Sequence, residues 1–192
     1  MSIKNLEKAI NNLNSLSRLI VPTATAKALN RVGQATIRQG SRIVAKEAVV
    51  GDGKKKGIPV KLVRQRARLK KANPQRLSAG IKINRGNLPA IKLGAAQVRL
   101  SRRKGDQKGR GSYLKIGPYR FRNAFIQQLA NGRWQVMRRV SDSRYPIDVV
   151  KVPLARPLTV SFWKISRQLI NSDMGKEISY ALKNQLRIHL TR

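Results

Sequence analysis

The net charge of the chain limits its fold and its partners more than any other sequence feature. Its 192 residues include 42 Lys and Arg but only 8 Asp and Glu, which gives a net charge of +34. Such a surface repels itself and attracts polyanions, so the sequence predicts a polyanionic partner. Hydrophobic residues still make up 41% of the chain, which favours a packed core over disorder. We expect one domain, residues 1–192, because domains average about 150 residues.

The positive charge is concentrated in the middle of the chain. Residues 1–49 have a net charge of +6, residues 50–122 of +20 and residues 123–192 of +8. We therefore predict that the middle region contacts the polyanion and that the flanks form a scaffold. The candidate DNA-contact residues are the basic side chains of this region: Lys54, Lys55, Lys56, Lys61, Arg64, Arg66, Arg68, Lys70, Lys71, Arg102, Arg103, Lys104, Lys108 and Arg110.

Hydrophobic periodicity predicts helices at both ends of the chain. Apolar residues recur every three or four positions in residues 3–20, and an Ala-rich segment over residues 24–49 predicts a second helix with Thr23 as its cap. Its small side chains favour close packing against a neighbour. A final helix is expected over residues 158–190, and residues 171–175 are a point at which it could break.

Between these helices, apolar residues alternate with polar ones, as in half-buried strands. Asn131 and Gly132 form the turn pair most typical of a β-hairpin. The sequence therefore predicts an α+β fold with N-terminal helices, a central, mostly antiparallel sheet with basic loops, and a C-terminal helix. The expected segments are 1–49 (helical), 50–122 (highly basic loops and strands), 123–152 (hairpin and connection) and 153–192 (C-terminal helix). Strands are expected within residues 79–100, with Ile91 and Leu93 in one of them, and at residues 113–117, 120–129 and 133–140.

Three basic segments lie in the middle region. Residues 51–57 and 101–112 combine Gly with Lys and Arg, and we expect both to be loops that are mobile in the free protein, because like charges repel. Residues 61–71 contain six basic residues, and their apolar spacing allows a short basic helix that ends at Pro74. Together these segments could follow a phosphate backbone through counterion release, without reading base sequence.

The aromatic residues leave two roles open. Trp134 and Trp163 are expected in the core, and the alternative is that they lie in an oligomer interface, where tryptophan is enriched. Tyr113, Tyr119 and Phe121 lie near the basic segments. Core packing is the favoured role for these rings, and stacking on the bases of a single strand is the alternative.

The sequence gives little support for catalysis or metal binding. The chain has no Cys and one His, which excludes thiolate sites and sites with two imidazoles. His189 is expected to be a surface or packing residue. Asp142 and Asp148 fit turn formation and the neutralisation of Arg144 better than a catalytic pair. We expect no enzyme and no cofactor, since carboxylates that could hold metal ions for phosphodiester cleavage are scarce.

No targeting or membrane segment is expected. The longest run without a charge is residues 123–132, which is far shorter than the roughly 18 residues of a membrane span. The sequence start has an early carboxylate and no apolar region typical of a signal peptide. We therefore expect an intracellular protein without a membrane partner.

Several long stretches resemble one known family. Residues 81–94 and 124–137 resemble the minor tail protein Z family of lambda-like tailed phages. The same resemblance extends to residues 3–7, 61–70, 144–153 and 180–187, and so covers nearly the whole chain. The loop at residues 51–59 is longer here, and residues 101–112 differ in detail.

The resemblance implies a structural tail completion protein without catalytic residues. Such proteins act late in the assembly of a long flexible tail, at its head-proximal end. There they meet the tail terminator and other tail or neck proteins, and they are associated with placing the DNA end inside the tail. We therefore expect a siphovirus virion protein, present in the host cytoplasm during assembly, that acts in head-tail joining. The sixfold symmetry of such a tail makes a hexameric ring the expected assembly. The alternative is a free, non-specific nucleic-acid-binding protein of the nucleoid type.

Overall fold

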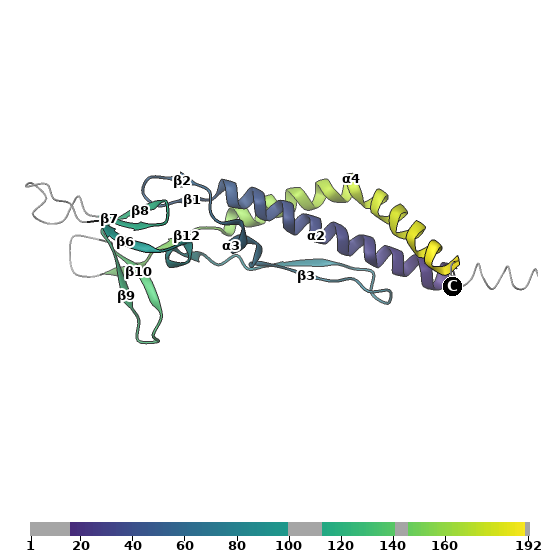
Figure 1. The fold of residues 1–192 in the computed structure, drawn as a ribbon, viewed down its shortest axis with the longest axis horizontal. Coiled ribbons are helices and arrows are strands. Elements are labelled where there is room, and N and C mark those ends of the chain that lie inside the picture. Colours follow the sequence, from purple (N-terminus) through teal and green to yellow (C-terminus); the bar gives the residue numbers. More distant parts are fainter. Residues whose placement is uncertain (1–15, 100–112, 141–145, 191–192) are drawn as a thin grey trace, which may run out of the picture. The chain divides into compact units, whose positions relative to one another are not determined.

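The computed structural model describes residues 16–99, 113–140 and 146–190 (Figure 1). These residues form two compact units. The helical unit takes the described parts of Met1–Gly40, Arg66–Asn84 and Val160–Arg192, and the sheet unit takes those of Ser41–Gln65 and Arg85–Thr159. The single domain inferred from chain length stays a prediction. Among the described residues, no helix combines the length and the apolar character that a membrane span requires.

Two long helices form the frame of the helical unit. Helix α2 (Val21–Glu47) follows directly on a π-helical turn, η1 (Leu16–Ile20). Helix α4 (Ala155–Leu190) ends the described chain. Both helices contribute residues to both units. They agree with the two long helices expected from the hydrophobic periodicity.

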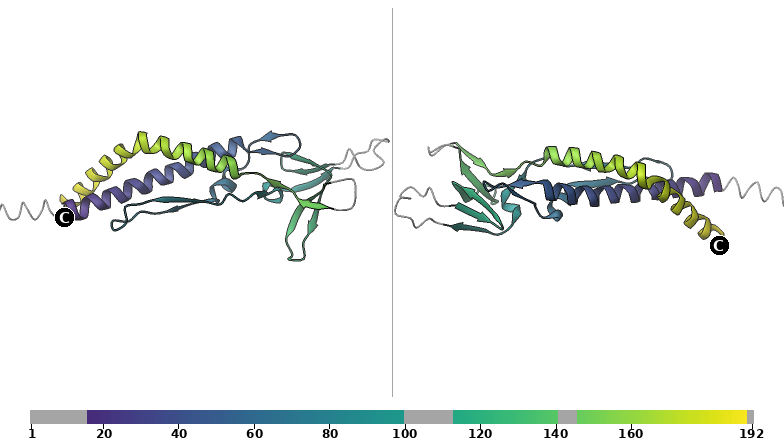
Figure 2. Two further views of the ribbon diagram at one scale, coloured as in Figure 1. Left: turned by 180° about the vertical axis from the view of Figure 1, so that it is seen from behind. Right: turned by 90° about the horizontal axis from the view of Figure 1, so that it is seen from above.

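Small side chains bring α2 and α4 close together within the helical unit (Figures 1 and 2). Ala28 and Ala181 are buried in one cluster near the end of α4. At the other end of the contact, a Cβ added to Gly40 would lie 3.2 Å from the Phe162 ring. The helices are therefore antiparallel, and the expected role of the Ala-rich segment in close packing is confirmed.

The remaining element of the helical unit is a two-stranded ribbon. Strand β3 (Ala67–Lys70) pairs antiparallel with β4 (Gly80–Ile83). Each strand alternates between more and less exposed residues, as expected for a ribbon with one face on a helix.

The described residues of the sheet unit form four small antiparallel sheets. Leu114, Ile116 and Val136 of these strands are fully buried. The pairs are β1 (Val49–Val50) with β2 (Lys55–Lys56), and β5 (Leu88–Pro89) with β12 (Lys151–Val152). The triplets are β6 (Ala96–Arg99), β7 (Tyr113–Ile116) and β8 (Tyr119–Arg122), and β9 (Ala124–Gln128), β10 (Trp134–Arg139) and β11 (Ile147–Val149). The unit also contains two short helices, α3 (Val60–Arg64), which follows β2, and the 3₁₀ helix η2 (Ala90–Leu93), which lies between β5 and β6.

The predicted α+β class is confirmed. The hairpin at Asn131 and Gly132 is also confirmed, since β9 pairs with β10 across residues 129–133 and Gly132 has a φ of 74°. The prediction of a single central sheet is wrong in detail, because the described strands pair in five separate small sheets. The expected strand over residues 120–129 is divided at Asn123, whose φ of 54° turns the chain between β8 and β9.

Three local predictions near the helices are wrong. Thr23 does not cap a helix; its hydroxyl donates to the carbonyl of Leu19 one turn earlier, so it lies inside continuous helical structure. Residues 171–175 do not break α4. Most of the first expected helix, residues 3–15, lies outside the described residues.

Two predictions in the basic region are also wrong. Residues 61–71 do not form one basic helix. Helix α3 ends at Arg64 and strand β3 follows. The strand forms because Ala67 and Leu69, two residues apart, both point toward the core. Residues 91–93 belong to η2 rather than to a strand.

Candidate nucleic-acid interface

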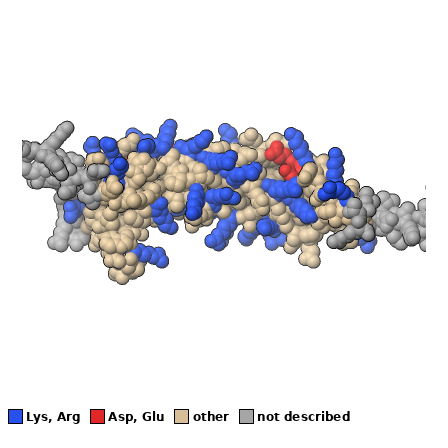
Figure 3. Space-filling model, in the orientation of Figure 1, with Lys and Arg blue, Asp and Glu red and all other residues tan. Residues whose placement is uncertain are grey.

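Nine of the predicted DNA-contact residues lie in the described chain, and they are divided between the two units. Lys and Arg side chains are spread over the face drawn in Figure 3, and Asp and Glu form only a small patch on it. The helical unit holds Arg66, Arg68, Lys70 and Lys71, and the sheet unit holds Lys54, Lys55, Lys56, Lys61 and Arg64. Arg102, Arg103, Lys104, Lys108 and Arg110 lie outside the described residues.

The β3–β4 ribbon gathers cations on one of its faces. Residues directly opposite each other in an antiparallel pair point to the same face, and Arg68 is opposite Lys82. Lys70, two residues after Arg68, shares this face. All three side chains are exposed. We call Arg68, Lys70 and Lys82 the ribbon face.

The other face of the ribbon is fixed on α2. Leu69 covers Gly33, where an added Cβ would lie 2.6 Å from the leucine Cδ1. Just beyond β3, the Asn30 amide donates to the carbonyl of Ala72 at 2.9 Å and accepts from its N–H at 2.8 Å. The two contacts hold the ribbon on one side and leave the ribbon face to solvent.

Arg66 differs from the other described candidates because it is half-buried. Its guanidinium donates to the carbonyl of Asn84 at 3.5 Å, where the ribbon begins. Burial lowers the pKa of the Arg66 guanidinium from its ordinary value, since desolvation disfavours the charged form. Arg66 therefore supports the end of the ribbon, while Arg68 and Lys70 present their charges to solvent.

A second cationic face lies on β7 and β8 in the sheet unit. The register places Lys115 opposite Arg120 and Tyr113 opposite Arg122. The Arg120 guanidinium lies 5.1 Å from the centre of the Tyr113 ring, within range of a cation–π contact. We call Tyr113, Lys115, Arg120 and Arg122 the β7–β8 face.

The rings near the basic region take different roles. Tyr119 and Phe121 are buried on the inner side of β8, which confirms the core role for these two. Tyr113 is half-buried and belongs to the β7–β8 face. The candidate list omitted Lys82, Lys115, Arg120 and Arg122. The strict alternation of residues 113–116 and 119–122 was the available signal, because it separates buried from outward positions.

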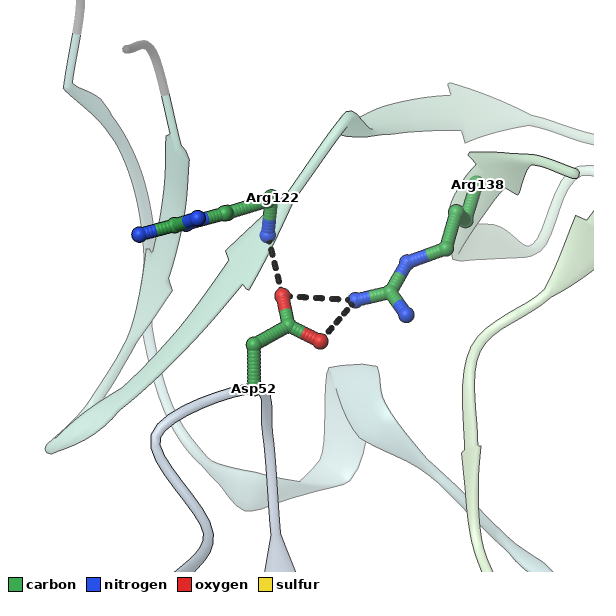
Figure 4. Close-up of polar contacts among 3 residues, drawn as sticks. All are labelled: Asp52, Arg122 and Arg138. Atoms are coloured by element: carbon green, nitrogen blue, oxygen red, sulfur yellow. Dashed lines mark hydrogen bonds and ion pairs between the residues drawn. The ribbon is translucent and has the colours of Figure 1, made fainter. Parts of the chain in front are cut away.

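The carboxylate of Asp52 anchors the β1–β2 hairpin, the lysine-rich hairpin that contains Lys54, Lys55 and Lys56, to the edge of β8 (Figure 4). The Asp52 N–H donates to the Arg120 carbonyl at 3.0 Å, and the Arg122 N–H donates to Asp52 Oδ2 at 2.5 Å. Arg138 Nη2 donates to both carboxylate oxygens, at 2.7 and 2.8 Å. Gly51 has a φ of 73°, and a Cβ there would lie 2.7 Å from the Arg120 carbonyl oxygen, so the approach requires glycine.

The expected loop at residues 51–57 is wrong at Lys55 and Lys56, which form a paired strand, and its expected mobility stays a prediction. The segment is the β1–β2 hairpin, with Lys54, Lys55 and Lys56 exposed at its tip and second strand. Its far end is held by the Tyr119 hydroxyl, which donates to the carbonyl of Gly57. Burial raises the pKa of the Tyr119 hydroxyl, because desolvation disfavours the phenolate.

The sheet unit has a small cavity beside this anchor. It has a volume of about 200 Å³ and is lined by Asp52, Phe121, Arg138 and Lys151 among others. Ligand pockets usually measure about 300–1,000 Å³, so this cavity is small for a substrate. In the described ranges, no three His, Asp or Glu residues lie close enough together to hold a metal ion.

The remaining candidates have separate positions. His189 is exposed on α4, which confirms the surface role. Asp148 is exposed on β11, and Asp142 lies outside the described residues. Trp134 and Trp163 are 55% and 63% exposed, so burial of these rings in the core is wrong. Their alternative role in an interface stays a prediction.

Comparison with known proteins identifies relatives of the chain among phage tail proteins. Residues 3–192 match the family described as "Prophage minor tail protein Z (GPZ)". The chain is 55% identical to the "Tail completion protein" of Escherichia phage N15 over 192 residues, and the alignment spans both chains completely. It is 47% identical to the "Tail completion protein Z" of Escherichia phage lambda over 200 aligned residues, again across both chains. No solved structure matches the chain.

These relatives confirm the family that the sequence resembles. They indicate a role in phage tail assembly and a place in the virion. The family consists of structural proteins and not of enzymes, in agreement with the sequence-based expectation. The chain belongs to the prophage minor tail protein Z family.

Proposed function

We propose that the chain is a tail completion protein at the head-proximal end of a phage tail. There it takes part in head-tail joining and holds the end of the viral DNA without reading its sequence. Two relatives named for tail completion support the role in completing the tail. The observation that carries the contact with DNA is the direct opposition of like charges on two strand faces, Arg68 with Lys82 and Lys115 with Arg120.

Opposed like charges are costly in the free protein. Like charges directly across a strand pair destabilise it by roughly 0.2–1 kcal/mol. A phosphate backbone removes this cost and releases counterions when the cations replace them. The exposed cations of the ribbon face are spaced along the strand at about 6.8 Å, two residues apart. They suit contacts to successive phosphates, which position a duplex but do not read its bases.

The expected hexameric ring is part of this proposal, and its charge limits what DNA alone can do. Six copies at +34 each would carry +204. A duplex segment as long as one protein layer is thick, roughly 40 Å, carries only about 24 phosphate charges. DNA would therefore neutralise a small part of the ring. Acidic surfaces of neighbouring tail or neck proteins, the tail terminator among them, would have to neutralise much of the rest.

The salt dependence of DNA binding tests the role of the ribbon face. The variant R68Q/K70Q/K82Q removes three exposed cations, and the control R38Q/R42Q/K46Q removes three exposed cations from α2. Binding of both to a 20-base-pair duplex is measured by fluorescence anisotropy between 50 and 300 mM salt. If the ribbon face contacts three phosphates, the slope of log K against log salt should fall by about 2.7. A smaller change is expected for the control.

Equal effects of the two variants would contradict the assignment of the ribbon face. A wild-type protein that binds no duplex at low salt would contradict DNA contact altogether. A wash of purified virions in roughly 1 M salt, where the Debye length is about 3 Å, tests the structural role. Retention in a fixed copy number is expected. Complete loss from virions, with rebinding to bare DNA at low salt, would favour a free nucleic-acid-binding protein.

A further inference from the structure

Helix α4 has an apolar face that the described residues of its own unit do not cover. Phe162, Ile165 and Leu169 are buried in the helical unit. Val160, Trp163 and Ile170 of the same helical segment are 57%, 63% and 48% exposed. Isolated exposed apolar residues are common, but three large ones within eleven residues of one helix require a reason.

The exposed residues form one stripe on the opposite side of the helix. At about 100° per residue, Val160, Trp163 and Ile170 lie within a sector of roughly 80° around the helix axis, and Arg167 lies in the same sector. The centre of this sector is roughly 150° from the centre of the buried face. A helix seam has contact positions spaced three, four and three residues apart; here Val160, Trp163 and Ile170 take three of these positions and Arg167 takes the fourth. A helix that is apolar on both sides is normally buried on both.

Two cations belong to the same outer surface. The Arg167 guanidinium lies 4.6 Å from the centre of the Trp163 ring, and Lys164 is exposed beside it. Helix α4 contains no acidic residue before Asp173. We call Val160, Trp163, Lys164, Arg167 and Ile170 the outer stripe of α4.

We propose that the outer stripe binds an acidic protein, through a surface in which apolar side chains lie beside carboxylates. The tryptophan supplies the kind of large, amphipathic anchor that dominates protein interfaces. Lys164 and Arg167 supply charge that such a surface complements. The inference goes beyond DNA binding, since it uses none of the residues assigned to DNA.

Charge argues against the other occupants. Two copies of this chain that met through the same stripe would place Lys164 and Arg167 against their own counterparts, cation against cation. A phosphate backbone would satisfy Lys164 and Arg167 but leave the three apolar side chains in water. An acidic protein surface satisfies both sets at once.

Photocrosslinking from the stripe identifies what lies against it. A photoreactive p-benzoylphenylalanine replaces Trp163 in assembled particles, and the same replacement of Val140, which is 60% exposed and has no assigned role, is the matched control. The proposal predicts a crosslink from position 163 to an acidic segment of another tail or neck protein, identified by mass spectrometry. A crosslink from position 163 to this chain, to DNA or to lipid would overturn it. So would no crosslink from position 163 in particles that contain the protein.

Binding of variants to tails assembled without this chain gives an independent test. The variant V160S/W163S/I170S should bind such tails about tenfold more weakly or worse, since truncation of a central tryptophan has a large effect. The control V140S, at an exposed apolar residue outside the stripe, should bind within about twofold of the wild type. K164E/R167E should also weaken binding, because it reverses the complementary charge. Circular dichroism should show unchanged melting of these variants, since the replaced side chains are exposed. Equal binding of the triple variant and the wild type would refute the proposal.

Discussion

Replacement of Asp52 by Ala tests whether one carboxylate holds the lysine-rich hairpin on β8. The carboxylate accepts from the Arg122 backbone and from the Arg138 guanidinium. Removing it leaves Arg138 beside a hairpin with three consecutive lysines. We expect the hairpin to loosen and the protein to lose stability.

The expected loss of stability depends on how exposed the Asp52–Arg138 ion pair is. Hydrogen bonds to charged groups contribute about 1.5–3 kcal/mol each when they are shielded. Here the Asp52 and Arg138 side chains are 33% and 35% exposed, so solvent screening reduces the ion pair toward the range of about 0–1 kcal/mol. The bond to the Arg122 N–H adds about 1–2 kcal/mol. We therefore expect Asp52→Ala to lower the free energy of unfolding by about 1–3 kcal/mol.

Asp52→Asn separates the two contributions. The amide oxygen can still accept from the Arg122 N–H, while the ion pair with Arg138 is lost. Its effect should be about 0.5–1 kcal/mol, clearly smaller than that of Ala. A double-mutant cycle of Asp52→Ala with Arg138→Ala should give a coupling free energy of at least about 0.5 kcal/mol.

Urea unfolding measures the global effect, and amide hydrogen exchange at Arg122 measures the local one. The Arg122 amide should exchange faster in Asp52→Ala, because its acceptor is gone. The reasoning would be refuted if Asp52→Ala were as stable as the wild type and its Arg122 amide equally protected. Equal losses for Ala and Asn would assign the whole effect to the ion pair and none to the backbone contact.

Three further substitutions test other contacts by urea unfolding. Gly51→Ala should cost about 2 kcal/mol or more, because a positive φ and a backbone oxygen at 2.7 Å both oppose a Cβ; a neutral effect would contradict the close approach. Asn30→Ala should cost about 1–3 kcal/mol, since it leaves the N–H and carbonyl of Ala72 without their partner; an unchanged midpoint would contradict this. Tyr119→Phe should cost about 0.5–1.5 kcal/mol at neutral pH. Because burial raises the pKa of Tyr119, its ionisation favours the unfolded chain above about pH 10. The advantage of the wild type over Tyr119→Phe should therefore shrink as the pH rises from 9 to 11.5, and a growing difference would contradict the sign.

The long helices could be predicted because their signal repeats over many turns. Helix α4 nevertheless runs through residues 171–175, where the sequence allows a break. Glycine in a helix costs about 1 kcal/mol relative to alanine. Leu169 before this segment and Ala181 after it are both buried on the same helix, and this packing outweighs the local preference.

The basic region shows where local spacing is ambiguous. Leu62, Arg66 and Leu69 fit a helix, while Ala67 and Leu69 fit a strand equally well over so few residues. The outcome depends on the pairing of Leu69 with Ile81, which comes from a distant segment. Short segments of this kind are decided by tertiary contacts that periodicity does not contain.

The sequence predicts which basic residues belong to the candidate site but not how the fold arranges them. The sequence identified Arg68 and Lys70 as exposed cations, and the structure agrees. The opposition of Arg68 and Lys82 depends on strand register, and a shift of one residue would place Lys82 on the other face. The exposure of Trp163 likewise depends on which of two apolar faces of α4 meets α2.

The positions of the carboxylates are consistent with the proposed role of the two cationic strand faces. Glu177 pairs with Arg31 across the two helices at 3.2 Å, and Asp52 pairs with Arg138 across the sheet unit. These scarce carboxylates therefore join parts of the fold. The ribbon face and the β7–β8 face contain no Asp or Glu at any of the described, paired positions, even though one carboxylate opposite Arg68 would relieve repulsion at once. A surface selected only for solubility would mix the two signs at such positions, so the unmixed cations of these faces are consistent with the proposed contact with DNA phosphates.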